Sequence, residues 1–116
     1  MMVVIEGVLD AAELAMVRQR LADAEWEDGA ATAGAHAQDR KANWQIRDGS
    51  ELAASLGQLI VDRLWANPLF ISAALPRQIY PPRFNRYDLG QTYGAHIDAA
   101  LMRAPGASRM LRTDLS

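Results

Sequence analysis

Residues 84–98, FNRYDLGQTYGAHID, are the stretch of this chain that says most about its fold and chemistry. His96 and Asp98 stand two residues apart within it. On a β-strand, residues two apart project from the same face, so an imidazole nitrogen and a carboxylate oxygen would converge on one point. That pair suits Fe(II), Mn(II) or Zn(II), although His-x-Asp alone is a weak signal that often occurs by chance.

The residues upstream of His96 make a metal site a more specific prediction. Tyr87, Gly90 and Tyr93 extend the pattern to Y-x-x-G-x-x-Y-x-x-H-x-D. Gly90 suits a turn between two strands, which would place Tyr87 across from the strand that bears His96. A phenol there can donate a hydrogen bond to a ligand carboxylate beside the metal. For Tyr93, ordinary aromatic packing on a strand is the favoured interpretation.

The part of the chain before residue 75 has a mainly helical pattern. Asp10 suits an N-cap, with Glu13 three residues later as in a capping box, so a helix is predicted over about residues 11–25. A second helix should begin after Asp48 or Ser50 and end near Asn67. Its apolar stripe consists of Leu52, Leu56, Leu59, Ile60 and Leu64. Shorter elements are predicted as a strand at 3–5, a strand beginning at Trp26, a loop over 29–39 and a strand at 43–46.

Beyond residue 75, prolines, aromatics and short alternating stretches replace the helical period. Strands are predicted at 78–80, 84–87, 91–97 and from 111 to 115. The fold class expected is therefore α+β, with helices packed outside an antiparallel sheet or barrel. The helical part should cover about residues 1–75, and the β-structure should start in about residues 76–116.

Composition narrows the class of protein. Half of the 116 residues are apolar and 22% are charged, which is typical of a soluble globular chain. We expect no membrane segment and no secretory signal, and the absence of cysteine weakly favours the cytoplasm. The net charge of -2 gives no reason to expect nucleic acid as a partner. Six arginines in residues 77–116 form either an exposed basic surface or a pocket for anionic ligands.

The whole chain resembles the bacterial PKHD-type hydroxylases, which are Fe(II)- and 2-oxoglutarate-dependent dioxygenases related to the prolyl 4-hydroxylases. The resemblance rests on the stretch quoted above, on NPLFISAALPRQIYPP before it, on RTDLS after it and on VLDAAELAMVRQRLADAEWEDGAATAG near the start. It implies a double-stranded β-helix (jelly-roll) core with N-terminal helices. It also implies iron, 2-oxoglutarate as co-substrate and often L-ascorbate.

Residue by residue, the resemblance makes His96 and Asp98 the first histidine and the carboxylate among the iron ligands. It makes Tyr87 a residue that touches 2-oxoglutarate. Asn43 and Gln45 resemble a polar segment of the family that faces the substrate pocket, but a hydrogen-bonded edge strand explains them equally well. For the complete enzyme, the implied reaction consumes 2-oxoglutarate and dioxygen. One oxygen atom enters succinate as carbon dioxide is released, and the other becomes a hydroxyl group on a substrate carbon.

The sequence departs from the family pattern in one respect. The distal histidine ligand and the arginine for the far carboxylate of 2-oxoglutarate would both follow Ser116, so we expect an N-terminal portion of a dioxygenase with an incomplete β-core. His36 is expected to be a solvated loop residue rather than a substitute ligand. No spacing favours Arg103, Arg109 or Arg112 as the missing arginine.

Two hypotheses from different classes follow. The first is a PKHD-type hydroxylase that is inactive in this 116-residue form. The second is a non-catalytic scaffold or dimerisation module, in which His96 and Asp98 are vestigial. The sequence does not select a substrate, which could be a prolyl or lysyl side chain of a peptide or a small molecule. A homodimer stays open as well.

Overall fold

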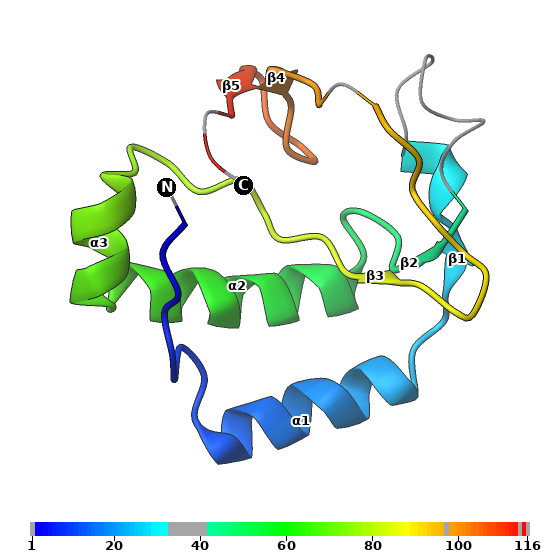
Figure 1. The fold of residues 1–116 in the computed structure, drawn as a ribbon, viewed down its shortest axis with the longest axis horizontal. Helices are drawn as coiled ribbons and strands as arrows, with labels where there is room; N and C mark the ends of the chain where they lie inside the picture. The colour runs from blue at the N-terminus through cyan, green and yellow to red at the C-terminus, as the bar shows by residue number, and fades with distance from the viewer. Residues whose placement is uncertain (1, 33–41, 97, 114, 116) are drawn as a thin grey trace.

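The computed structural model describes residues 2–32, 42–96, 98–113 and 115 (Figure 1). Within these ranges the chain forms three α-helices, a short 3-10 helix and five two-residue strands. Both sheets are antiparallel, so the α+β class is confirmed. The elements in chain order are α1 (Ala11–Ala22), β1 (Glu27–Asp28), the 3-10 helix (Gly29–Thr32), β2 (Trp44–Gln45), α2 (Glu51–Trp65), α3 (Pro68–Ala74), β3 (Asn85–Arg86), β4 (Leu101–Met102) and β5 (Leu111–Arg112).

The start of α1 is fixed by the capping box that the sequence predicts. The Asp10 carboxylate accepts a hydrogen bond from the Glu13 backbone N–H at 2.7 Å, and the Glu13 carboxylate accepts one from the Asp10 N–H at 3.1 Å. These two contacts satisfy amide groups that would otherwise have no partner in the first turn. The helix ends at Ala22, three residues earlier than expected.

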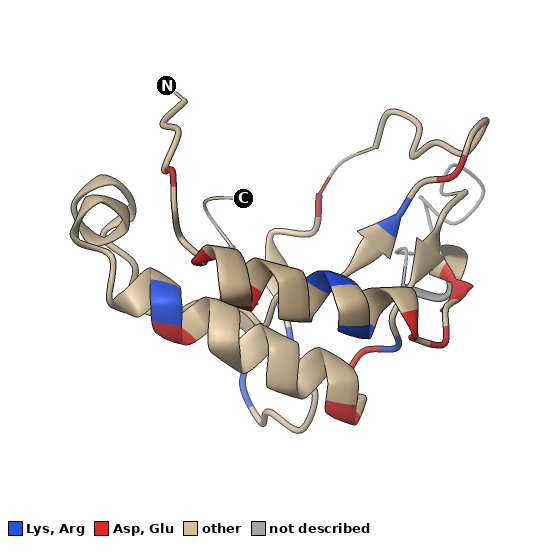
Figure 2. Ribbon diagram, turned by 90° about the horizontal axis from the view of Figure 1, so that it is seen from below, with Lys and Arg blue, Asp and Glu red and all other residues tan. Residues whose placement is uncertain are grey.

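Helices α1 and α2 run in opposite directions and are joined by side chains at both ends. The second Glu13 oxygen accepts from Arg63 Nε at 2.7 Å, while Arg20 donates to Ser55 Oγ at 2.9 Å. Figure 1 shows α2 running between α1 on one side and the segment that leads to β3 on the other. Figure 2 shows acidic and basic residues along α1, whereas those of α2 lie only near its two ends.

The apolar core is small and central. Among the described residues, the buried hydrophobic side chains are Val17 of α1, Leu56 of α2 and Ile46 beside β2, with exposed fractions of 6%, 1% and 3%. Ser50 caps α2 through its side chain, as predicted for one of two alternatives. The core therefore lies where α1, α2 and the end of β2 meet.

Strand β2 is the central strand of a three-stranded sheet in the order β1-β2-β3. Trp44 is opposite Asp28 on one side and Arg86 on the other. On that face the Arg86 guanidinium lies 4.8 Å from the ring centre of Trp26. The strand predicted at 43–46 is present as β2, but the alternative that explained Asn43 and Gln45 by an edge strand is wrong, because β2 has a hydrogen-bonded neighbour on each side. Two of the three strands also precede residue 75.

Strands β4 and β5 form a separate hairpin, with Leu101 opposite Arg112 and Met102 opposite Leu111. In Figure 1 the hairpin stands on the far side of α2 from α1. The prediction of a strand from residue 111 is confirmed at its start, but β4 was not predicted. Its two residues lie in a stretch without alternating polarity, which leaves little for a sequence pattern to detect.

Three predicted strands are wrong, and a helix was missed. Residues 3–5 and 78–80 form no strand, because neither stretch has a neighbour to complete a hydrogen-bonded ladder. Residues 91–96 make only an isolated bridge at Tyr93, and beside it the Ala42 N–H donates to the Thr92 carbonyl at 2.7 Å. Helix α3 begins with Asn67 as N-cap and Pro68 in the first turn, so that proline starts a helix as well as ending the previous one.

None of the helices in the described ranges combines the length and the apolar character needed to span a bilayer.

Candidate functional site

His96 and Asp98 come together as the sequence predicts, but in a loop rather than on a strand. The His96 Nε2 and Asp98 Oδ1 atoms are 3.0 Å apart. The imidazole is mostly covered, with 20% of its side chain exposed, whereas the carboxylate is 81% exposed. Ile97 between them lies outside the described residues. The pair therefore offers two possible metal-ligand atoms, a nitrogen that is mostly shielded from solvent and an oxygen on an exposed side chain.

The other ring nitrogen of His96 shows which atom is available for chemistry. His96 Nδ1 is 2.7 Å from the Gly94 carbonyl oxygen. A carbonyl oxygen only accepts hydrogen bonds, so Nδ1 must carry the proton in this contact. In a neutral imidazole the lone pair is then on Nε2 and faces a carboxylate oxygen, which is another acceptor. A second proton or a bound cation between Nε2 and Asp98 Oδ1 would resolve this conflict.

Tyr93 holds the imidazole from one side. The Tyr93 and His96 rings are stacked, with centroids 3.6 Å apart and planes 17° from parallel. Tyr93 and His96 are three residues apart in one loop, so the stack and the Gly94 contact fix the ring together. The packing role expected for Tyr93 is observed, but its ring packs against His96 in a loop rather than along a strand.

Tyr87 lies directly after β3 and is 48% exposed. It precedes the turn at Gly90, where Gly90 has φ +83° and the Gln91 N–H donates to the Asp88 carbonyl at 2.9 Å. The turn predicted at Gly90 is thus confirmed. The structure brings His96 and Asp98 together in one loop and places Tyr87 on the other side of that turn.

A row of buried amide side chains lines the face of the sheet opposite Trp44. Gln45 is fully buried, and Asn43 is 2% exposed. Asn43 Nδ2 donates to Asn85 Oδ1 at 3.1 Å, which links β2 to β3. The Oδ1 atom of Asn43 has no hydrogen-bond partner among the described residues, and it faces Gly29 so closely that a Cβ there would overlap it.

Register relates this row to Tyr87. Gln45 is opposite Asn85 and Trp44 is opposite Arg86, so continuing this antiparallel register by one more residue places Asn43 opposite Tyr87. Sequence reasoning paired Asn43 with Gln45 correctly, since both are buried on one face. The polar row therefore extends along the face of the sheet that carries Tyr87.

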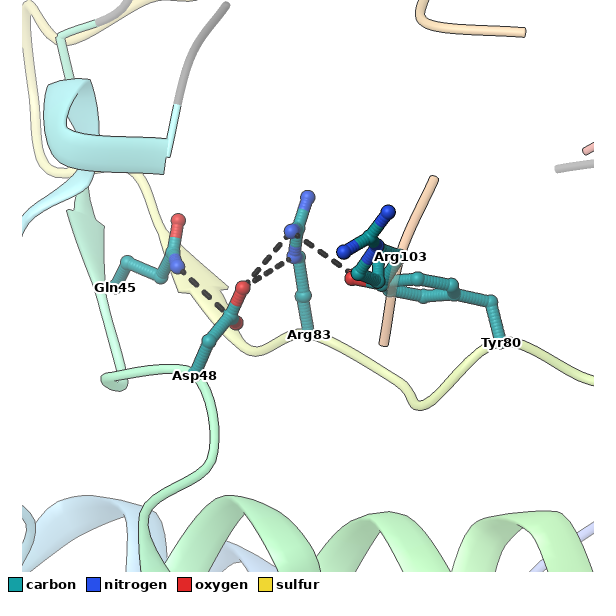
Figure 3. Close-up of polar contacts among 5 residues, drawn as sticks. All are labelled: Gln45, Asp48, Tyr80, Arg83 and Arg103. Atoms are coloured by element: carbon teal, nitrogen blue, oxygen red, sulfur yellow. Dashed lines mark hydrogen bonds and ion pairs between the residues drawn. The ribbon is translucent and has the colours of Figure 1, made fainter. Parts of the chain in front are cut away.

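A second polar cluster, which sequence reasoning missed, joins the start of α2 to the segment before β3 (Figure 3). Arg83 Nε donates to Asp48 Oδ2 at 2.9 Å, and Gln45 Nε2 reaches the other Asp48 oxygen at 3.5 Å. Arg83 also donates to the Tyr80 hydroxyl at 3.2 Å, and that hydroxyl donates to the Arg103 carbonyl at 3.2 Å. Asp48 and Arg83 are 35 positions apart, so no local pattern could reveal the pair.

Potential further ligands are limited in the described part of the chain. No group of three or more histidine, aspartate or glutamate side chains with metal-binding geometry occurs there. His36, considered as a substitute ligand, lies outside the described residues. Of the arginines considered for a carboxylate, Arg103 uses its backbone carbonyl to bind Tyr80.

No protein-family model matches the chain. Curated relatives do match it, and the three named here are described as PKHD-type hydroxylases. That of Acidovorax ebreus (strain TPSY) is 59% identical, that of Teredinibacter turnerae is 50% identical, and one from Pseudomonas putida (strain W619) is 47% identical. Each match covers all 116 residues of this chain and 51% of the relative. The chain belongs to the PKHD-type hydroxylase family, and it spans about half the length of these curated relatives.

Proposed function

We propose that this chain is part of an Fe(II)- and 2-oxoglutarate-dependent hydroxylase in which His96 and Asp98 supply two of the iron ligands. The observation that carries the proposal is the contact between His96 Nε2 and Asp98 Oδ1. The Gly94 carbonyl holds the proton on the other nitrogen, so Nε2 presents a lone pair toward the carboxylate. Such an outer hydrogen bond is typical of metal-binding histidines.

The spacing of the two atoms also fits one metal ion. A nitrogen and an oxygen atom about 3 Å apart could both reach one metal ion at an ordinary coordination distance of about 2.1 Å. The observed separation is 3.0 Å. Imidazole with carboxylate is the donor set of the facial triad in non-haem iron oxygenases. The open Asp98 side would admit the ion, while the covered imidazole would fix its position.

The remaining parts of the proposed site follow the resemblance to the PKHD-type hydroxylases. We propose that Tyr87 contacts 2-oxoglutarate, and that the third ligand and the arginine for the far carboxylate belong to the half that the relatives have beyond the match. Residues 1–116 would then form the helices and the start of a jelly-roll core. L-ascorbate is proposed as an accessory reductant on the same resemblance.

In this proposal the residues of the chain bind and orient. His96 and Asp98 would hold Fe(II), Tyr93 would fix the imidazole, and Tyr87 would orient the co-substrate by hydrogen bonding. Bound iron, with dioxygen and 2-oxoglutarate as co-substrates, would supply the oxidising power that converts a substrate C–H bond to C–OH. The buried row at Asn43 and Gln45 would support the sheet that carries Tyr87.

The partners proposed are the small-molecule co-substrate and a substrate that is either a peptide prolyl or lysyl side chain or a small molecule. We propose a cytoplasmic protein that contacts neither nucleic acid nor membrane. A homodimer of this chain is a further possible assembly, and sedimentation velocity can distinguish it from a complex with a different polypeptide.

The second candidate is a non-catalytic scaffold. It is favoured by one observation, which is that the described residues include only two converging metal donors where the triad needs three. Under this alternative the chain alone would bind iron no better than a variant that lacks the pair.

The test is anaerobic equilibrium dialysis of the chain against Fe(II), with His96→Ala and Asp98→Ala as test variants. We expect each variant to weaken Fe(II) binding by more than about tenfold, since both donors contact the ion directly. His36→Ala is the matched control, because it removes the other histidine and should leave the affinity unchanged. Equal affinity in the wild type and both test variants would eliminate the proposed site and support the scaffold.

A further inference from the structure

The chain exposes more surface than a self-contained protein of its size. Its accessible surface is 8600 Å² for 12.7 kDa. A compact monomer of this mass exposes about 6,200 Å², so the excess is roughly 2,400 Å². The radius of gyration is 15.0 Å, whereas a compact chain of this length has one of about 13 Å. Specific interfaces bury about 800 Å² per partner, and obligate interfaces bury more, so the excess is large enough for an obligate interface.

A mainly apolar groove lies on α2, and we refer to it as the α2 groove. Its volume is about 400 Å³. One wall is the α2 face made by Ala53, Ala54, Gly57 and Val61, and the other is the segment from Ile79 to Pro82. Pro105 closes one end from the turn of the β4–β5 hairpin. Small side chains on one wall and prolines on the other leave room for larger apolar side chains from outside.

The second polar cluster holds the walls of the α2 groove in place. Asp48 and Tyr80 line the groove, and Arg83 bridges them (Figure 3). The hydrogen bond from Tyr80 to the Arg103 carbonyl connects the same wall to the hairpin. The groove is therefore preformed, which lowers the conformational entropy that a partner must remove on binding.

The hairpin extends the exposed apolar surface beyond the groove. Leu101 of β4 is 56% exposed, and Met110 beside β5 is 47% exposed. Within the described residues, β4 and β5 pair only with each other. An isolated two-stranded hairpin is marginally stable in water, so this one needs a further neighbour.

We propose that the α2 groove and the β4–β5 hairpin together dock the polypeptide that forms the other half of the PKHD-type relatives. The relatives are about twice as long as this chain, and the match leaves 49% of their length without a counterpart here. That half is of sufficient size to bury the excess surface, and its apolar strands would fill the groove and pair with the hairpin edge. The proposal rests on the proposed function only through the family relationship, because docking needs no metal.

The experiment uses the full chain together with the half of the Acidovorax ebreus protein that it does not match. The two polypeptides are co-expressed, so that neither has to fold alone, and the complex is purified through a tag on the Acidovorax half. Sedimentation velocity in EDTA then measures stoichiometry and affinity. A 1:1 complex is the expected result.

Ala54→Arg tests the α2 groove, and Leu101→Arg tests the hairpin. Both residues are exposed, so circular dichroism should show unchanged helix content. Each charge should weaken the complex by about tenfold or more, because it would be buried at the centre of the interface without a partner. Ala15→Arg on the exposed face of α1 is the matched control, and it should leave the affinity unchanged.

Three results would overturn the proposal. One is the absence of a complex, and another is a complex that is equally sensitive to Ala54→Arg and Ala15→Arg. The third is a homodimer of this chain that Ala54→Arg abolishes in the absence of the other half, which would make a second copy the occupant. Because EDTA removes iron, a failure of the Fe(II) dialysis with the 1:1 complex intact would reject the metal site alone.

Discussion

The α1–α2 pair and the segment from residue 88 to 113 differ in what stabilises them. The helices have capping side chains at their starts, two side-chain bridges between them and the buried residues Val17 and Leu56. The later segment has turns, one isolated β-bridge and a two-stranded hairpin. It has no buried hydrophobic residue among those described. Yet the later segment carries His96 and Asp98, the residues with the most evident chemistry.

This difference indicates that the two regions reach their structures by different routes. A helix satisfies its own backbone, so caps and an apolar stripe are enough to define it. A strand needs a neighbour for every amide group along one edge. The proposed metal ligands thus lie in the region whose elements have the fewest partners among the described residues.

Removing buried volume should give the largest effect and a clear contrast between the regions. Leu56→Ala should lower the free energy of unfolding by about 2–5 kcal/mol, because the side chain is 1% exposed. Leu101→Ala, at a residue that is 56% exposed, should change it by less than about 0.5 kcal/mol. Urea unfolding followed by circular dichroism measures both. Similar losses would mean that the hairpin is packed as tightly as the helices.

Glycine substitutions should separate packing from backbone strain. Gly29→Ala should cost about 1–3 kcal/mol, because the new Cβ would overlap the Asn43 carboxamide. Gly106→Ala in the hairpin turn should cost about 1 kcal/mol, since its φ is +76° but the space around it is open. The same unfolding measurement applies. A larger loss for Gly106→Ala than for Gly29→Ala would mean that backbone strain costs more here than the overlap with Asn43.

The Tyr93–His96 stack should contribute a smaller amount, and it should act on metal binding. Tyr93→Leu should weaken Fe(II) binding by about two- to tenfold, which corresponds to the loss of one aromatic pair. Tyr93→Phe keeps a ring and should retain the affinity. Equilibrium dialysis provides the readout. A loss in Tyr93→Phe equal to that in Tyr93→Leu would show that stacking is not the cause.

Acidification should give the smallest effect, and it should act on the helices. The hydrogen bond from Arg63, with help from the Asp10 N–H, lowers the pKa of Glu13 below its ordinary value of 4.5, and the same pair raises the pKa of Arg63. The contribution of Glu13 to stability is thus fully present above pH 4.5 and is lost as the pH falls through the lowered pKa. Glu13→Gln should therefore flatten the stability–pH curve below that point. An unchanged slope of stability against pH in Glu13→Gln would show that Glu13 is not the source of the acid-dependent loss of stability.

The same contrast explains which features could be predicted from the sequence. The capping box at Asp10, the stripe of α2 and the turn at Gly90 are local signals, and all three are confirmed. The strands expected at 78–80 and 91–97 were inferred from composition, but a strand also requires a partner that composition does not specify. Near His96 the imidazole bonds to the Gly94 carbonyl, so this local contact uses an acceptor that a ladder would need.

The candidate site shows the same limit. The spacing of His96 and Asp98 correctly predicted their proximity, although the strand assumed for it is absent among the described residues. The contacts of Arg83 with Asp48 and Tyr80 depend on how the chain returns to the start of α2. The stacking of Tyr93 on His96 depends on a loop conformation, which residue types alone leave undetermined.

The two oxygens of Glu13 have a consequence for the order of folding. One oxygen accepts from an amide three residues away, and the other accepts from Arg63, which is fifty residues away. Short-range contacts close quickly, whereas contacts across long loops form late and slow the search. We therefore expect the cap to form early and to hold the second oxygen in position before α2 arrives. A nascent α1 would then act as the template on which α2 finds its register.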